Sequence, residues 1–221
     1  MKKIIILLSI LFLIPASFCF ANDPEVQSPE ITKTMTVPFD GKQLSDLTYV
    51  IEDTAYMAVY SSLSLLDEKK IYEDLQLIDN MTNVKKLKVF LNSFGGGMYA
   101  GFAIADQLKR VTDRFEVSIY ASGVVASAAV MVFLVSENRY ATEDCFFMVH
   151  EISFNPGAGA SMSASEIKLM NNLVEMLTAR YVKNLVRVTN KSENEWQEMM
   201  KEETWFSAQD ALDWGLVTEV K

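Results

Sequence analysis

The sequence predicts a single α/β domain whose strands pair largely in parallel. Short β-rich runs alternate with longer runs of helical periodicity over residues 46–221, an order typical of parallel sheets covered by helices. The 221 residues are enough to bury one sizeable core. Before this domain, residues 22–45 are polar and proline-bearing, which predicts a loose N-terminal arm. We find no internal repeat of fixed period and no low-complexity tract.

The elements follow in order along the chain. β-rich runs predict strands at residues 55–60, 87–91, 115–120, 140–152 and 216–220, the fourth of which reads as one or two strands. Helical periodicity predicts helices at residues 67–80, 99–110, 125–135, 165–188, 193–201 and 207–214. Acidic residues lie near the start of the first helix. Ser207 is placed to cap the last helix, and Gly215 ends it.

Two of the predicted helices have a distinctive pattern. Residues 125–135 are almost wholly apolar, which predicts a buried helix. The helix over residues 165–188 carries one long apolar stripe, formed by Ile167, Met170, Leu173, Val174, Leu177, Tyr181, Val182 and Leu185. A stripe of this length suits a helix that packs on a neighbouring subunit, and it equally suits core packing within one chain.

The first 21 residues have the composition of a secretory signal. Lys2 and Lys3 precede an apolar run over residues 4–14, Pro15 breaks that run, and Cys19-Phe20-Ala21 offers a cleavage site. The apolar run is short for a membrane span, although an uncleaved membrane anchor stays an alternative. We therefore expect an exported protein, either periplasmic or secreted.

The charge and the cysteine content restrict the partners and cofactors. The net charge of −9 becomes more negative if the signal and its two lysines are removed, so nucleic acid and anionic lipid are poor candidates as partners. Cys145 would then be the one cysteine left, which excludes an internal disulfide. With one histidine and one cysteine, no zinc site is expected, and no other cofactor is predicted.

Three segments carry residues suited to acyl transfer. The chain's one histidine, His150, ends an apolar run, and Ser127 lies upstream among small residues. A serine needs a neighbouring base before it attacks a carbonyl, and the oxyanion that forms needs backbone N–H donors. The pair Gly95-Gly96, between a strand and a helix, allows close approach of the backbone near the positive end of that helix. Each segment alone also has a structural interpretation, as a tight turn, a helix serine or a core histidine.

Taken in order, these segments resemble the Clp protease proteolytic subunit family. The likeness rests on residues 92–96 (Asn-Ser-Phe-Gly-Gly), 123–127 (Gly-Val-Val-Ala-Ser), 148–150 (Met-Val-His) and the closing segment 205–217. The resemblance implies a ClpP/crotonase-like fold of stacked ββα units with a protruding helical handle, and a serine peptidase mechanism. It also implies a homo-oligomeric ring, in which the helix after the 157–159 glycine loop joins two rings.

The resemblance also assigns roles to individual residues. It implies that Ser127 is the nucleophile and His150 the general base, and that the backbone N–H groups of Gly95 and Ala128 bind the oxyanion. The family's aspartate falls on Glu203. Two further acids, Glu202 and Asp210, are alternatives for this third member of the triad.

The sequence departs from the family pattern at several positions. Phe94 stands where the family has proline, and Glu151-Ile152 stands where it has Gln-Pro. The longer side chain of Glu203 moves the carboxylate by roughly a bond length, and displacements of that size cost rate. Lys168 offers a rival base, since the signal peptide peptidases and the membrane-bound stomatin-linked peptidases of this broad fold use a Ser–Lys dyad. A lysine base needs burial to lower its pKa.

The leading hypothesis is a secreted or periplasmic serine endopeptidase that acts through an acyl-enzyme with a Ser-His-acid triad. The alternatives are a Ser–Lys dyad peptidase and a catalytically degenerate assembly that binds peptides without cleaving them. Acyl-CoA chemistry on the same fold fits poorly with export. The expected substrates are short peptides or unfolded protein. Because the family's ATPase partner works where ATP is present, an exported member would act without one; association with a membrane stays open.

Overall fold

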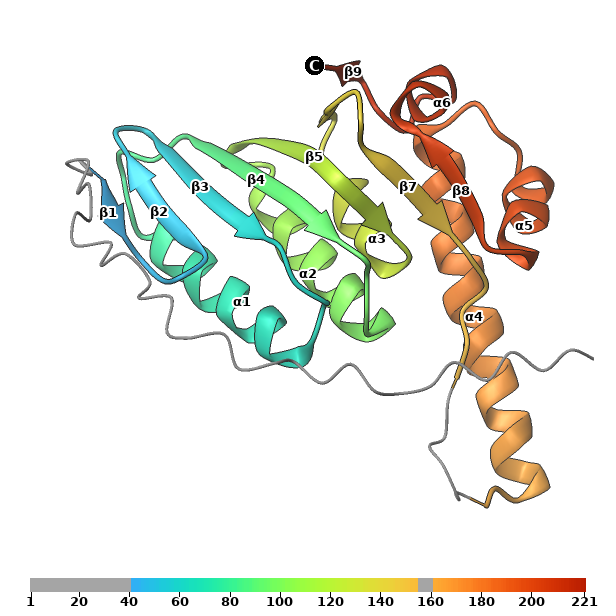
Figure 1. Ribbon diagram of the computed structural model, residues 1–221. Coiled ribbons are helices and arrows are strands. Elements are labelled where there is room, and N and C mark those ends of the chain that lie inside the picture. The colour runs from blue at the N-terminus through green and yellow to red at the C-terminus, as the bar shows by residue number, and fades with distance from the viewer. Residues whose placement is uncertain (1–40, 155–160) are drawn as a thin grey trace, which may run out of the picture. The chain divides into compact units, whose positions relative to one another are not determined.

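The computed structural model describes residues 41–154 and 161–221 (Figure 1). Strands and helices alternate along the chain, as expected from the sequence. The expected signal at residues 1–21, most of the expected arm and the 157–159 loop lie outside these described residues. The strands are β1 (Lys42–Gln43), β2 (Thr48–Ile51), β3 (Thr54–Val59), β4 (Lys86–Ser93), β5 (Glu116–Ala126), β6 (Asn138–Ala141), β7 (Phe146–Val149), β8 (Thr204–Ser207) and β9 (Glu219–Val220). The helices are α1 (Leu65–Asp79), α2 (Met98–Val111), α3 (Ala128–Phe133), α4 (Ala164–Val188), α5 (Glu193–Lys201) and α6 (Ala208–Asp213).

The strands form one mixed sheet with the order β1-β2-β3-β4-β5-β6-β9. Neighbouring strands from β3 to β6 pair in parallel, whereas β2 is antiparallel to β3. Figure 1 shows α1, α2 and α3 on one face of this sheet. Leu87, Val89 and Leu91 of β4 are fully buried at every second position, the alternation expected of a strand that presents one face to a core. The predicted α/β fold with largely parallel pairing is confirmed.

The long strand β5 changes partners halfway, and this change builds the site described below. Its residues 118–121 pair with β6, and its residues 124–126 pair in parallel with β7. Between these two parts lies Gly123 with a φ of 67°, in the left-handed region that favours glycine. Strand β7 then pairs antiparallel with β8.

Several elements differ from the sequence expectations. The expected helix over residues 125–135 was wrong at its start, because β5 continues through Ala126 and the helix α3 begins at Ala128. An apolar run hides this boundary, since a buried strand and a buried helix look alike over so few residues. The short strands β2 and β8 were not predicted, and β1 lies within the residues assigned to the arm.

Helix α4 is packed on the domain over its last turns and exposed over its first. Tyr181, Val182 and Leu185 are buried, whereas Leu169 and Met176 are 61% and 70% exposed. Figure 1 shows the first turns extending away from the sheet, as expected for a handle. Core packing within one chain therefore accounts for the last turns, and packing of the first turns on a neighbouring subunit stays a prediction. Among the described residues, no helix is both long and apolar enough to cross a membrane.

Candidate active site

Ser127 lies at the turn between β5 and α3 in a strained backbone conformation. Its φ of 54° and ψ of −127° are unusual for a residue other than glycine, and such conformations persist where the surrounding structure over-determines them. Here the Ser127 N–H donates to Met148 O at 2.8 Å. The Ser127 carbonyl accepts from Val130 N and from the Tyr181 hydroxyl, both at 3.0 Å. The backbone is thus held on both sides of the Ser127 side chain.

His150 directly follows β7, and the pairing of β7 with β5 brings it to Ser127. The parallel register sets Ala126 opposite Met148, so the residues just beyond the two strand ends lie at the same edge of the sheet. His150 Nε2 and Ser127 Oγ are 2.8 Å apart in a partly buried environment. This distance lies within the range in which an imidazole accepts a proton from a hydroxyl.

The two predicted oxyanion donors lie side by side next to Ser127. A Cβ added at Gly95 would lie 2.9 Å from Ala128 N and 2.8 Å from Ser127 Cβ, so the site requires glycine here. Ala128 is the first residue of α3, where an N–H has no partner within the helix. The Gly95 N–H, however, donates to the buried Ser93 Oγ at 3.1 Å. Gly95 therefore contributes its amide to an oxyanion only if Ser93 shares or releases it.

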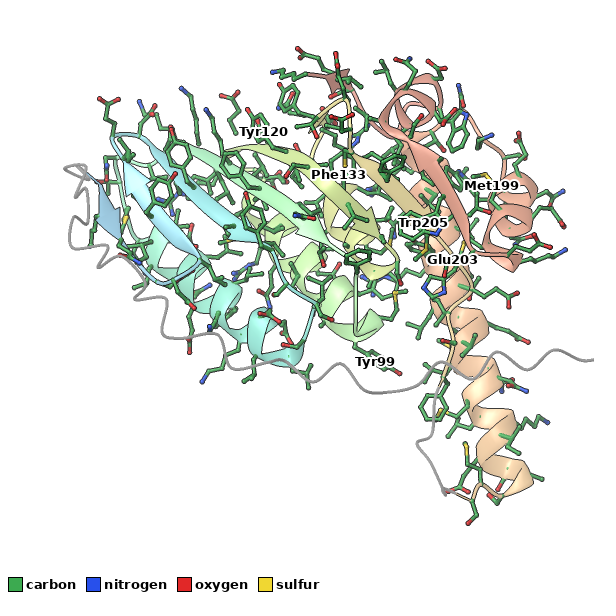
Figure 2. All side chains as sticks on the ribbon, in the orientation of Figure 1. Tyr99, Tyr120, Phe133, Met199, Glu203 and Trp205 are labelled. Atoms are coloured by element: carbon green, nitrogen blue, oxygen red, sulfur yellow. The ribbon has the colours of Figure 1, made fainter. Side chains whose placement is uncertain are left out.

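Glu203 lies at the correct strand end for the third triad member but is not bonded to the histidine. The antiparallel register pairs Val149 with Thr204, which sets Glu203 across from His150. Its Oε1 accepts from Trp205 Nε1 at 2.7 Å, and the side chain is exposed. Figure 2 labels Glu203 and Trp205 close together near the start of β8. Among the described residues, no hydrogen bond joins a carboxylate to His150.

The structure does not bring the two alternative acids to His150. Glu202 ends α5 and is exposed. Asp210 lies in the first turn of α6, whose N-cap is Ser207; its Oδ2 accepts from the Ser207 hydroxyl at 2.6 Å and from the Ser207 N–H at 3.0 Å. These bonds, that of the side chain first, lower the pKa of Asp210. Ser207 pairs with Phe146 at the other end of β7, four residues or roughly 13 Å from His150.

Lys168 is also not placed to act as a base. It lies in the exposed first turns of α4, whereas Met170 and Leu177 of the same helix face Ser127 across a pocket. At about 100° per residue, Lys168 lies about 160° around the helix from Met170. The side chain therefore projects from the far side of α4, exposed and turned away from Ser127.

An apolar pocket opens beside Ser127 and His150. Its volume is about 250 Å³, and its walls come from the start of α2, the segment after β7 and the middle of α4. The lining residues are Gly96, Gly97, Met98, Tyr99, Ser127, His150, Ile152, Ser153, Phe154, Met170, Leu173, Val174 and Leu177. Such a pocket can hold one large apolar side chain of a peptide next to Ser127.

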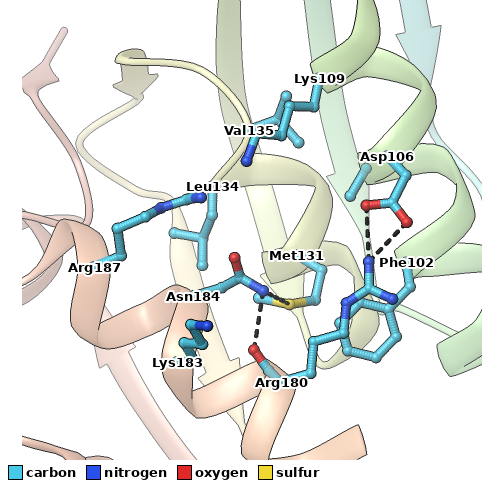
Figure 3. A pocket seen from close by; sticks show the side chains of 11 residues that line it. Phe102, Asp106, Lys109, Met131, Leu134, Val135, Arg180, Lys183, Asn184 and Arg187 are labelled. Carbon is cyan, nitrogen blue, oxygen red and sulfur yellow. Dashed lines mark hydrogen bonds and ion pairs between the residues drawn. The ribbon is translucent and has the colours of Figure 1, made fainter.

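A second pocket lies away from this site, where α4 packs on α2 and α3 (Figure 3). Its volume is about 320 Å³, and neither Ser127 nor His150 lines it. It contains an ion pair in which Nη2 of Arg180 lies 2.7 Å from each of the two carboxylate oxygens of Asp106. Within the part of the chain that the structure describes, no group of three His, Cys, Asp or Glu side chains could hold a metal ion.

The comparisons with known proteins identify the family of the chain. A family model described as Clp protease matches residues 40–221. The chain belongs to the Clp protease family. ATP-dependent Clp protease proteolytic subunit 2 of Treponema denticola is 25% identical over 154 residues, which cover 69% of this chain and 74% of that protein. The protein of the same name from Borreliella burgdorferi is 26% identical over 191 residues, which cover 81% of this chain and 92% of that protein.

Solved structures of the Clp protease family share the fold. ClpP1 from Listeria monocytogenes superposes with a TM-score of 0.62 at 24% identity, and a mutant of that same protein superposes with 0.66 at 23%. In both cases the match covers 75% of this chain and 90% of the other. The ClpP-like mixed α/β fold is therefore confirmed, and the protein is a hydrolase of a family of serine peptidases.

Two contributions to this Clp-type site were missed in the sequence. Tyr181 was assigned only to the apolar stripe of α4, yet its hydroxyl bonds to the Ser127 carbonyl. Ser93 was part of a family segment, yet its hydroxyl holds the Gly95 amide and donates to Ser61 O at 2.6 Å. A tyrosine in a stripe of aliphatic residues was the one available signal, because a buried hydroxyl needs a partner. Cys145 is no competing nucleophile, since burial raises the pKa of its thiol to about 12.

Proposed function

We propose that the chain is an exported serine endopeptidase that hydrolyses peptide bonds through an acyl-enzyme on Ser127. The observation that carries this proposal is the 2.8 Å contact of Ser127 Oγ with His150 Nε2, which lies beside the N-terminus of α3. The apolar pocket next to it suits the side chain that precedes the scissile bond. Membership of the Clp protease family supports the same chemistry.

The arrangement performs both halves of the reaction. Ser127 Oγ attacks the carbonyl carbon as His150 Nε2 takes the hydroxyl proton, and the Ala128 N–H stabilises the oxyanion, joined by the Gly95 N–H when Ser93 releases it. His150 then gives its proton to the leaving amine as the C–N bond breaks. Water, activated by the same imidazole, attacks the acyl-enzyme and frees Ser127. Glu203, across the strand pair from His150, is the carboxylate we assign to orient the ring.

Covalent labelling tests the nucleophile and the base. A fluorophosphonate should label the wild-type assembly, and Ser127→Ala should abolish the label. Ser118→Ala is a matched control on the same strand, because Ser118 lies at the end paired with β6 and should label like wild type. His150→Ala should slow labelling by at least a hundredfold, whereas Lys168→Ala should not. An unlabelled wild-type assembly contradicts the peptidase mechanism and favours an assembly that only binds peptides.

Export and assembly are part of the proposal. The basic start, the apolar run over residues 4–14 and the small residue Ala21 support removal of residues 1–21. An exported member would form a homo-oligomeric ring and would act on short peptides or unfolded chains without an ATPase. The protein isolated from its own cells should begin at the residue after Ala21, and its native mass should be several times the subunit mass. A full-length cytosolic form that needs ATP for proteolysis contradicts this part alone.

A further inference from the structure

The hydroxyl of Tyr181 is a polar group inside the core that the peptidase mechanism does not use. Tyr181 is completely buried on α4, and its hydroxyl donates to the Ser127 carbonyl oxygen at 3.0 Å. It does not line the substrate pocket, so it does not touch a bound peptide. Burial raises the pKa of Tyr181, which keeps the hydroxyl protonated and able to donate.

The geometry points to Tyr181 as a positioning residue that aims the Ala128 N–H at the oxyanion. The Ser127 carbonyl and the Ala128 N–H belong to one planar peptide unit and point in opposite directions. A hydrogen bond that fixes the carbonyl oxygen therefore also fixes the direction of the N–H. This inference rests on the proposed function, since it concerns the oxyanion of that reaction.

The turn needs such a support because its backbone is strained. The φ of Ser127 is 54°, and holding a residue in such a conformation costs of order 1–3 kcal/mol. If the hydrogen bonds of its backbone were lost, Ser127 would relax toward an ordinary conformation. The amide side is tied to Met148 O, and the carbonyl side is tied to Val130 N and to Tyr181. Val130 belongs to the same short helix and moves with the turn. Of these two contacts to the carbonyl, that of Tyr181 is the one that comes from a separate element.

Tyr181 can act as a fixed support because α4 is buried on the domain at this turn through Tyr181, Val182 and Leu185, and its neighbouring residues contact α2 and α3. Figure 3 shows the neighbouring Arg180 against Asp106 and Phe102 of α2; the guanidinium bonds both Asp106 oxygens and lies 4.3 Å from the Phe102 ring centroid. One turn on, Asn184 Nδ2 lies 4.0 Å from Met131 Sδ of α3. The position of the Tyr181 ring is therefore set by the helix layer.

The test is Tyr181→Phe, which keeps the ring and removes the hydroxyl. Tyr120→Phe is the matched control, since the Tyr120 ring stacks between Phe90 and Tyr140 on the sheet, away from the site. Removing a direct oxyanion donor costs about 10²–10³ in kcat, and loosening one donor should cost less. We expect kcat to fall about tenfold, KM to change less than twofold and the pH profile to keep its shape. Tyr120→Phe should change none of these.

A tetrahedral adduct separates this role from a merely structural one. A peptide boronate, whose adduct with Ser127 resembles the intermediate, should bind about tenfold more weakly to Tyr181→Phe, while the corresponding product peptide should bind unchanged. Rates are divided by the sites titrated with a fluorophosphonate, so that misfolded molecules do not count. Equal loss of boronate and product binding, or an unchanged kcat, overturns the inference and leaves the peptidase proposal intact. A wild type with no titratable serine overturns both.

Discussion

Adding one methyl group at Gly95 should disrupt the site and destabilise the fold, whereas the same change two residues later should not. A Cβ at Gly95 would lie 2.6 Å from Ala126 O and 2.9 Å from Ala128 N. Its φ of 90° also costs an L residue about 1–2 kcal/mol. Relief of the overlap by backbone shifts costs about 1–3 kcal/mol more. Gly95→Ala should therefore lower the free energy of unfolding by about 2–5 kcal/mol.

Gly97→Ala is the matched control for this loss of stability. Gly97 has a φ of −60°, and its added Cβ would meet only Leu63 O at 3.5 Å and Ala100 Cβ at 3.8 Å. Alanine there restricts the unfolded chain, which favours folding by about 0.4–1 kcal/mol, and it is a poorer helix cap by a similar amount. We expect a net change within about 1 kcal/mol.

Urea unfolding followed by tryptophan fluorescence measures both variants. With a slope of about 2 kcal/mol per molar urea, Gly95→Ala should lower the midpoint by roughly 1–2.5 M, and Gly97→Ala should change it by less than about 0.5 M. Fluorophosphonate labelling of the Gly95→Ala protein that stays folded should also be lost, because the new methyl group lies against Ala128 N. Equal midpoints for the two variants, or normal labelling of Gly95→Ala, would refute the packing argument.

Three further expectations concern the acids and one buried cation. Glu203→Gln should lower kcat at least tenfold while Glu202→Gln changes it less than twofold; equal effects in peptide turnover would contradict the assignment of Glu203. Ser207→Ala should cost about 1 kcal/mol at pH 7. The pKa of Asp210 lies below the ordinary 3.8, so its ionised form stabilises the fold above about pH 4. The stability difference between wild type and Ser207→Ala should therefore shrink as the pH falls below about 4, which denaturant unfolding at pH 7 and pH 3 measures. Arg139→Met should lower Tm by roughly 6–12 °C, since it removes the donors to the buried carbonyls of Leu216 and Ser136 and to the partly buried carbonyl of Gly215, at about 1 kcal/mol each and about 2–4 °C per kcal/mol; an unchanged Tm would contradict this.

The sequence predicted most of the helices from their helical periodicity, and the last one also from its end signals. Glu193–Lys201 was predicted with the bounds of α5, and Ser207 caps α6 as expected. The sequence could not separate β5 from α3, because residues 125–135 are apolar on both sides of that boundary. It missed β8 because four residues give little periodicity, and a strand so short depends on its pairing with β7.

The residues of the candidate site could be predicted from the sequence, whereas the contacts made by single side chains could not. Ser127 and His150 were singled out by residue chemistry and by the resemblance to the Clp protease proteolytic subunit family, not by a predicted strand pairing. In the structure they follow the ends of two strands paired in parallel, which brings them together. The bond of Ser93 to the Gly95 amide and that of Tyr181 to the Ser127 carbonyl depend on side-chain rotamers in the folded core. No periodicity in the sequence encodes such contacts.

Glu203, the expected third member of the triad, shows the same distinction most clearly. The register of β7 and β8 sets the backbone of Glu203 opposite His150, but the long, exposed side chain bonds to the Trp205 indole instead. For an exposed carboxylate, attraction to a cation at 4 Å is only about 1 kcal/mol, comparable to the net value of one hydrogen bond. Exchange of Trp205 for a protonated His150 is therefore nearly neutral in energy. During the reaction, positive charge develops on the imidazole of His150 and attracts the carboxylate of Glu203. The loss of kcat in Glu203→Gln therefore measures how much this attraction contributes to catalysis.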